Sequence, residues 1–235
     1  MLSIVIPTLN EEKYLPNLLK DLSKQSYKDF EVIVCDGEST DTTASIAENA
    51  GCITVSSTQK SPAAQRNFGA SIARGDTLLF LDADTSIASN CFLSDILQEF
   101  TQRNLSIASF KLHFTSPELK YRFLEKIYDL LEFLGRFTHP SCPGAGILVS
   151  YKIHNKINGF NERMLVGEDH EYALRASKVG KIGRTKCHPL NTSVRRFEKY
   201  GFWRVLTKWS YLLIRYIISG KLEKEVITYT YGEHS

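Results

Sequence analysis

The chain has 235 residues, a length that suits one large α/β domain with a small appendage. Hydrophobic residues make up 43% and charged residues 23%, the proportions of an ordinary globular protein, so a fibrous or disordered chain is excluded. The net charge is only +3, and no nucleic-acid partner is expected.

Apolar runs bounded by turn residues alternate with helix-period segments through the first 81 residues. The expected strands are 2–7, 30–35, 52–56 and 78–81, and the expected helices between them are 16–22, 42–50 and 61–74. Asn10 and Asp41 precede two of these helices and are the expected N-caps. Strand and helix alternate three times before the last strand, which predicts a parallel, right-handed, doubly wound sheet.

The second half has a less regular order of elements. Its pattern predicts helices at 88–102, 119–137, 152–157 and 166–179, with strands at 105–114 and 147–150. The fold class is therefore α/β, with helices flanking the sheet.

Two aspartates, Asp82 and Asp84, follow the apolar strand at 78–81. Alternation along an extended chain puts both carboxylates on one side, facing the crevice where open α/β sheets bind ligands. Hard oxygen ligands of this kind suit Mg²⁺ or Mn²⁺, which could in turn hold a diphosphate. The alternative for such a short motif is that Asp82 caps the next helix and Asp84 lies in a solvated turn.

Further polar residues lie at predicted strand and helix ends. The chain lacks both Gly-x-Gly-x-x-Gly after the first strand and Gly-x₄-Gly-Lys-Ser/Thr, so phosphate would be held by metal and by side chains such as Arg66. Asp36 could accept hydrogen bonds from a base edge or ribose, unless it only caps a turn. Glu168 and Asp169 could supply a base. Together these residues predict a nucleotide site in the first half and a proton acceptor in the second.

The chain resembles the family 2 glycosyltransferases, which have the GT-A fold. The matching segments are 4–12, 34–41, Arg66-Asn67-x-Gly69 with 73–76, 80–84, and Gly167-Glu168-Asp169 with Arg175. They occur in family order over roughly residues 2–198. The resemblance implies a Rossmann-like, mostly parallel sheet in a domain at 1–198, with a nucleotide-binding half at 1–100, an acceptor-binding half at 101–198 and an amphipathic helical tail at 199–235.

The resemblance also implies a role for each matching residue. Pro7, Thr8 and Glu11 would line the base and ribose pocket, Asp36 would bond the base, and Arg66 would approach the base or diphosphate. Asp82 would lie near ribose or metal, and Asp84 would ligate Mn²⁺ or Mg²⁺. Asp169 would be the catalytic base, with Glu168 beside it helping to bind the acceptor. His188 lies where some related enzymes place a third metal ligand, although a hydrogen-bonded loop histidine is the more common case.

These roles describe an inverting transfer from a UDP- or GDP-sugar to a hydroxyl acceptor, such as a cell-envelope glycan or a lipid-linked compound. The Gln-x-x-Arg-Trp motif of processive synthases is absent, and Ser193 to Phe197 occupies the corresponding region. Transfer of one sugar per encounter is therefore favoured over polymer synthesis. Two alternatives remain: a haloacid-dehalogenase-like phosphatase using Asp82 and Asp84, and a non-catalytic sugar-nucleotide-binding protein.

The C-terminal segment combines aromatic and basic residues. From residue 195 to residue 224 there are eight Lys/Arg against two Asp/Glu, and an apolar helix face follows from Phe202, Trp203, Leu206, Trp209, Leu212, Leu213, Tyr216 and Ile217. Such a helix is typical of a segment lying in a membrane interface. The alternative is that it packs on the domain or on a second subunit, forming a homodimer.

Location follows from three absences. The five cysteines are odd in number and lack Cys-x-x-Cys spacing, which is typical of buried thiols in a reducing compartment. The N-terminus enters a predicted strand without a signal peptide, and no charge-free run reaches the ~18–20 residues of a spanning helix. We expect a cytoplasmic protein, peripheral on the cytoplasmic face of the membrane if its C-terminal helix binds lipid.

Overall fold

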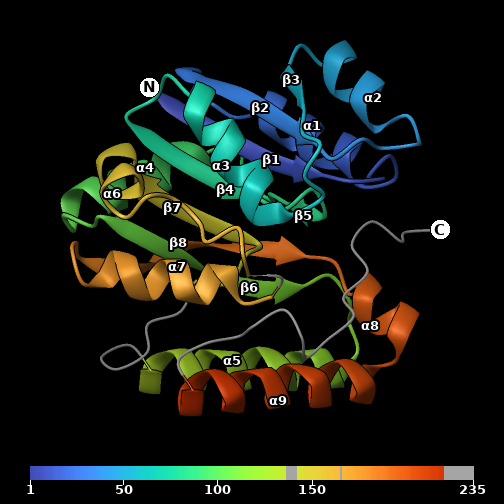
Figure 1. Ribbon diagram of the computed structural model, residues 1–235, viewed down its shortest axis with the longest axis vertical. Helices are drawn as coiled ribbons and strands as arrows, with labels where there is room; N and C mark the ends of the chain where they lie inside the picture. The colour runs from blue at the N-terminus through green and yellow to red at the C-terminus, as the bar shows by residue number, and fades with distance from the viewer. Residues whose placement is uncertain (136–141, 165, 220–235) are drawn as a thin grey trace.

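The computed structural model describes residues 1–135, 142–164 and 166–219, with only the backbone described at 212–219. One twisted sheet of eight strands runs through it, in the order β3-β2-β1-β4-β7-β6-β8-β5 (Figure 1). The strands are β1 (Leu2–Thr8), β2 (Phe30–Asp36), β3 (Ile53–Ser56), β4 (Thr77–Leu81), β5 (Thr85–Ser86), β6 (Ile107–Phe114), β7 (Gly146–Ser150) and β8 (Ile182–Thr192).

The N-terminal half of the sheet is parallel, as expected. β1 lies between β2 and β4 and is parallel to both, while β3 extends the edge in parallel with β2. Every residue of β1 is buried, because helices cover both faces of this half, and such strands read as continuous apolar runs. The carboxyl ends of β1, β2 and β4 therefore meet at one edge.

The second half of the sheet is mixed. β7 is antiparallel to β4, β6 is antiparallel to β7, and β8 returns parallel to β6 before pairing antiparallel with β5. The long strand β8 was not predicted from the sequence. Its exposed and buried residues follow no simple alternation, and the pairing with β6 shifts register between Ser109 and Lys111.

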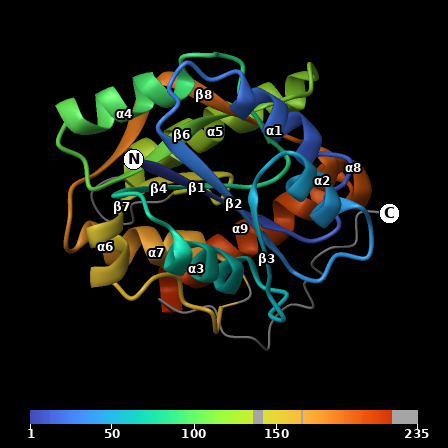
Figure 2. The same cartoon turned by 90° about the horizontal axis from the view of Figure 1, so that it is seen from above.

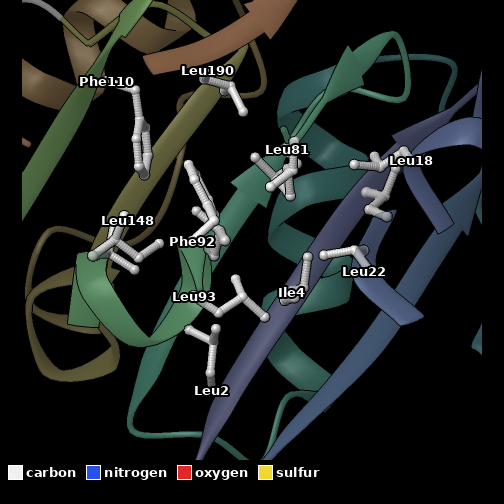
Figure 3. Close-up of a cluster of buried hydrophobic side chains, with 14 of the residues drawn as sticks. Leu2, Ile4, Leu18, Leu22, Leu81, Phe92, Leu93, Phe110, Leu148 and Leu190 are labelled. Atoms are coloured by element: carbon white, nitrogen blue, oxygen red, sulfur yellow. The ribbon is translucent and has the colours of Figure 1, made fainter. Parts of the chain in front are cut away.

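Helices cover both faces of the sheet (Figure 2). The helices α1 (Leu15–Ser23) and α4 (Phe92–Gln102) lie on one face, and α3 (Pro62–Ile72), α6 (Tyr151–Lys156) and α7 (Glu168–Ser177) lie on the other, with α2 (Thr43–Asn49) beside β3. Figure 3 shows the first core, in which Leu18 and Leu22 of α1 and Phe92 of α4 point toward β1 and β4. The second core packs α3, α6 and α7 against the same strands.

A separate layer lies beyond the edge of the sheet. Its helices α5 (Leu119–Gly135) and α9 (Phe202–Ser219) run side by side (Figure 1). Helix α5 follows β6, whose Phe114 N–H donates to Glu125 at 2.7 Å, and α9 follows β8 through α8 (Arg195–Tyr200). A third apolar cluster holds this layer together, with the Tyr128 and Trp209 ring centroids 6.4 Å apart. No helix in the described part of the chain combines the length and apolar content that a membrane crossing requires.

The C-terminal helix was predicted to present one apolar face. Phe202, Leu206 and Trp209 instead pack inward on the third cluster, whereas Trp203 is 74% exposed. The side chains of Leu212, Leu213, Tyr216 and Ile217 lie outside the described residues. The domain boundary proposed between residues 198 and 199 falls inside α8 and stays a prediction.

Two local predictions need correction. Asn10 does not cap the first helix, which begins at Leu15 after Tyr14. Asn10 instead adopts a left-handed φ of 57°, and its side-chain oxygen accepts a hydrogen bond from the backbone N–H of Thr40 at 2.9 Å. Asp41 does accept the N–H of Thr43 at 3.0 Å, but the helix begins at Thr43 with Thr42 as its N-cap residue.

Candidate functional site

The candidate nucleotide pocket lies at the carboxyl ends of β1 and β2, where Thr8 pairs with Asp36. Asp36 is buried, and its carboxylate accepts hydrogen bonds from the Thr8 hydroxyl at 3.0 Å and from the Ser39 N–H at 2.8 Å. Pro7 precedes Thr8 inside β1, opposite Cys35. These contacts fix Asp36 as an acceptor at the edge where the parallel strands end.

Gln65 of α3 supports the same edge, and its role was not predicted. Its Nε2 donates to the Thr8 carbonyl at 3.2 Å, and its Oε1 is buried without a hydrogen-bond partner among the described residues. A Cβ on Gly37 would lie 2.3 Å from Gln65 Nε2, so a larger residue at this turn would displace the Gln65 side chain. No pattern in the sequence distinguishes Gln65 from other helical polar residues.

Arg66 joins the two halves of the site. The side chain is only 2% exposed, and its guanidinium donates to Asp82 Oδ1 at 2.7 Å, to Glu168 Oε1 at 2.9 Å and to the Gly144 carbonyl at 3.2 Å. A buried charge of this kind is tolerated only when it is paired and hydrogen-bonded. The three predicted site residues Arg66, Asp82 and Glu168 are thus brought together from α3, the end of β4 and the start of α7.

Asp169 lies one residue further along α7 and is held differently. Its Oδ2 accepts the N–H of Gly144 at 2.7 Å, and its Oδ1 accepts the N–H of His170 at 2.8 Å. A Cβ on Gly144 would lie 3.1 Å from Arg66 Nη2 and 3.2 Å from Asp169 Oδ2, so a larger residue there would push on both groups. Burial, followed by the neighbouring Asp169 charge, raises the pKa of Glu168 despite its pairing with Arg66.

Tyr128 of α5 lies on the same side of the site. Burial and then the charge of Asp169 raise the pKa of Tyr128 to about 12, so its phenol stays protonated. Residues on α5 are far from Asp169 in sequence, and helix periodicity alone marks Tyr128 as a core position. Its proximity to Asp169 follows only from the tertiary structure.

Asp84 is the expected metal ligand, and its partner is a guanidinium. Arg195, the first residue of α8, has its Nε 2.8 Å from Asp84 Oδ2 and grips both Glu11 oxygens at 2.7 and 2.8 Å. Its guanidinium also lies 4.5 Å from the centroid of the Tyr14 ring. Arg195 was not predicted as a site residue, although the basic pair Arg195-Arg196 is visible in the sequence.

Asp84 lies among other carboxylates. Burial raises the pKa of Asp84 to about 6, Arg195 opposes that rise, and the charges of Asp82 and Glu11 add to it. No three His, Cys, Asp or Glu side chains are arranged as a ready metal cage within residues 1–135, 142–164 and 166–219. The chemistry of the donor set nevertheless fits a hard divalent cation, because it consists of mutually repelling carboxylates.

His188 lies elsewhere on β8. Its Nε2 is 2.7 Å from Asp95 Oδ2 of α4, and its ring packs near Phe92. The Asp84 carbonyl accepts the N–H of Ser193, five residues after His188, which is roughly 16 Å along an extended strand. The structure therefore does not bring His188 to Asp84, and its assignment as a metal ligand stays a prediction without structural support.

The site and the fold together define an α/β protein whose acidic residues converge at one edge of the sheet. The family model for Glycosyl transferase family 2 matches residues 3–158. The chain belongs to this family, as its sequence motifs indicated.

Known proteins agree with that assignment. The 4,4'-diaponeurosporenoate glycosyltransferase of Staphylococcus haemolyticus is 33% identical over 147 residues, which is 57% of this chain and 37% of that protein. Staphylococcus aureus TarS in complex with UDP superimposes with a TM-score of 0.65 at 21% identity, covering 82% of this chain and 60% of the other. A mannosyltransferase from Pyrobaculum calidifontis, in complex with GDP-Man and Mn²⁺, gives a TM-score of 0.69 at 18% identity, with coverage of 82% and 56%.

These matches confirm the predicted GT-A fold, with its curled α/β sheet flanked by helices. The chain spans little more than a third of the length of the S. haemolyticus relative.

Proposed function

We propose that the protein transfers one sugar from a nucleoside diphosphate sugar to a hydroxyl acceptor, with inversion at the anomeric carbon. The observation that carries this proposal is the pair of ion-paired hydrogen bonds made by Arg66. They connect Asp82 of the nucleotide half to Glu168, whose neighbour Asp169 is the candidate base. Relatives solved with UDP and with GDP-Man support a UDP- or GDP-sugar as donor.

In this proposal the nucleotide binds at the ends of β1 and β2. Asp36 accepts hydrogen bonds from the base, and Pro7, Thr8 and Glu11 line the base and ribose pocket. Arg66 and Asp82 lie toward the diphosphate. The burial of Asp36 and its hydrogen bonds from Thr8 and Ser39 support this role, because they hold an acceptor in a fixed orientation.

Asp169 acts as the general base, taking the proton of the acceptor hydroxyl as that oxygen attacks the anomeric carbon. Its two backbone hydrogen bonds, from Gly144 and His170, orient the carboxylate. Glu168 is engaged by Arg66 and is better suited to positioning than to proton transfer. Tyr128, held protonated near Asp169, can donate a hydrogen bond to the acceptor.

A divalent cation, Mn²⁺ or Mg²⁺, completes the proposal, with Asp84 and Asp82 as its protein ligands. The mannosyltransferase solved with GDP-Man and Mn²⁺ supports this cofactor. When bound, the ion neutralises charge on the departing nucleoside diphosphate. The protein's contribution is the set of carboxylates around Asp84.

Arg195 and the cation compete for Asp84 in this account. The Arg195→Gln variant is expected to bind Mn²⁺ on the order of tenfold more tightly in the absence of nucleotide. The reason is that an adjacent positive charge lowers the pKa of a carboxyl group by about one unit or more, and it should weaken the binding of another cation to a similar degree. Electron paramagnetic resonance of free Mn²⁺ measures this directly, with Arg204→Gln as the matched control. Weaker Mn²⁺ binding by Arg195→Gln would mean that Arg195 supports the site.

A panel of nucleotides tests the donor assignment. UDP, GDP, ADP and their sugars are compared for thermal stabilisation of the protein, with and without Mn²⁺, since a ligand that binds only the native state raises the melting temperature. We expect stabilisation by UDP or GDP compounds that Mn²⁺ enhances. No shift with any nucleotide would contradict the proposal.

The acceptor is proposed to be a cell-envelope glycan or a lipid-linked compound met at the cytoplasmic face of the membrane. Family membership removes the phosphatase alternative, whose nucleophile strand usually comes first, whereas β4 follows three strand–helix units. A non-catalytic nucleotide-binding protein is the second candidate. A normal nucleotide response without any transfer would favour it.

A further inference from the structure

Helix α5 carries apolar side chains on two opposite faces. Tyr121, Leu124 and Tyr128 face inward and join the third apolar cluster. An outer stripe points the other way and is exposed by 56–85%, namely Leu119, Phe123, Leu130 and Leu134. At 100° per residue these four side chains fall within a sector of about 60°, whose centre lies roughly 140° around the helix from that of the inner face. Exposed leucines are common singly, but a continuous stripe of this kind marks an interaction surface.

The layer that carries the stripe is strongly basic. Residues 119–135 and 195–219 together hold nine Lys/Arg and four Asp/Glu, a net charge of +5, so the rest of the chain is at −2. One of the nine, Arg195, pairs with Asp84 and Glu11 and is not part of this surface. Burial, followed by the nearby Arg204 and Arg196, lowers the pKa of Lys208, which shows that positive charges gather on this layer. Trp203 and Tyr211 of α9 add aromatic side chains that are 74% and 49% exposed.

We propose that the outer stripe of α5 contacts the surface of a membrane rich in anionic phospholipid, with the basic side chains of the layer at the headgroups. Charge complementarity selects this occupant. A second copy would bring two basic layers together, whereas an anionic lipid surface attracts them. Exposed Trp and Tyr are the aromatic residues enriched at membrane interfaces. The surface therefore differs from the one expected for α9 alone, because its apolar part comes from α5.

The same helix reaches the candidate site from its inner side. Tyr128 lies near Asp169, and Glu132 accepts hydrogen bonds from Ser109 at 2.8 Å and Arg184 at 2.6 Å. An α-helix is ~10 Å across, so one helix thickness separates the membrane surface from the acceptor side of the site. In this respect the inference rests on the proposed function and names its acceptor class, an amphiphile whose hydroxyl is presented at the lipid surface.

Flotation on a density gradient tests the inference. The full chain is mixed at low salt with vesicles of phosphatidylcholine containing ~30% phosphatidylglycerol, and with vesicles of phosphatidylcholine alone. We expect flotation with the anionic vesicles that weakens as salt is added. The Phe123→Glu/Leu130→Glu variant should bind at least tenfold more weakly. Ile72→Glu/Val179→Glu, which makes the same change at two apolar residues each 36% exposed, should bind as the parent does.

Three results would overturn the proposal. The parent protein could stay in the soluble fractions, the stripe variant could float as well as its control, or the parent could be a dimer that the stripe variant turns into a monomer. If the glutamate variant does not melt cooperatively, Phe123→Ser/Leu130→Ser decides the question instead. Nucleotide-induced stabilisation is measured on the same samples. If nucleotides do not stabilise the parent, the donor assignment is refuted. The flotation result would still show whether the outer stripe of α5 binds the membrane.

Discussion

Asp169→Asn is expected to abolish sugar transfer while leaving donor binding nearly intact. The amide has almost the shape of the carboxylate and can keep the hydrogen bond from the Gly144 N–H, now 2.7 Å long. It cannot take a proton, and general base catalysis typically contributes ~10²–10⁴-fold. The rate of product formation and the affinity for nucleoside diphosphate should therefore separate, the first falling by that factor and the second staying within about twofold.

Asp76→Asn is the matched control for this variant, because Asp76 is exposed and lies before β4, at the opposite edge of the sheet from the site. It should retain both activity and binding. Turnover that survives in Asp169→Asn would move the base to Glu168 or remove a protein base from the mechanism. Loss of nucleotide binding along with activity would show that Asp169 supports the structure of the site.

Asp84→Ala is expected to remove the metal dependence of nucleotide binding. Mutating a residue that only hydrogen-bonds to a metal ligand typically lowers metal affinity by ~10–100-fold. Removing a direct ligand should lower it by at least as much. Isothermal titration of UDP or GDP, with and without Mn²⁺, measures the effect. The parent should bind more tightly with Mn²⁺, and the variant should bind equally with and without it.

Arg195 adds a second expectation for the same titration. Without Asp84 its guanidinium keeps only Glu11 as a carboxylate partner among those found in the structure. Without metal, Asp84→Ala should therefore bind the diphosphate as well as the parent or better, since the Arg195 guanidinium no longer pairs with Asp84 and can attract the phosphates. An unchanged enhancement by Mn²⁺ in this variant would contradict the assignment of Asp84.

The N-terminal half could be predicted from the sequence because its strands are buried on both faces. β1, β2 and β4 are mostly apolar runs, and the predicted site residues Asp36 and Asp82 lie where two of those runs end. In parallel strands, position along the chain fixes position at the edge of the sheet. The family motifs lie in this region for the same reason.

The helices and strands predicted between residues 88 and 179 are also found, as α4, β6, α5, β7, α6 and α7. What could not be predicted in the second half is the strand β8 and the contacts that depend on residues far apart in the chain. Arg195 meets Glu11, 184 residues earlier in the chain, through a side-chain ion pair that no local pattern records. β8 mixes Gly183, Pro189 and charged residues, so it shows neither the apolar–polar alternation nor the continuous apolar run by which strands are recognised. The outer stripe of α5 has the same helical spacing as a core-facing stripe, and only the packed structure shows which face is covered.

The central claim, transfer from a nucleotide sugar, is tested most directly by asking which bond the protein breaks. Purified protein is incubated with Mn²⁺ and either UDP- and GDP-sugars or a phosphomonoester, and the released nucleoside diphosphate and phosphate are quantified by chromatography. The account predicts release of UDP or GDP from one nucleotide sugar, with water taking the sugar when no acceptor is added. This release should be lost in Asp169→Asn and retained in Asp76→Asn. Phosphate release from the phosphomonoester, with every nucleotide sugar left intact, would contradict it.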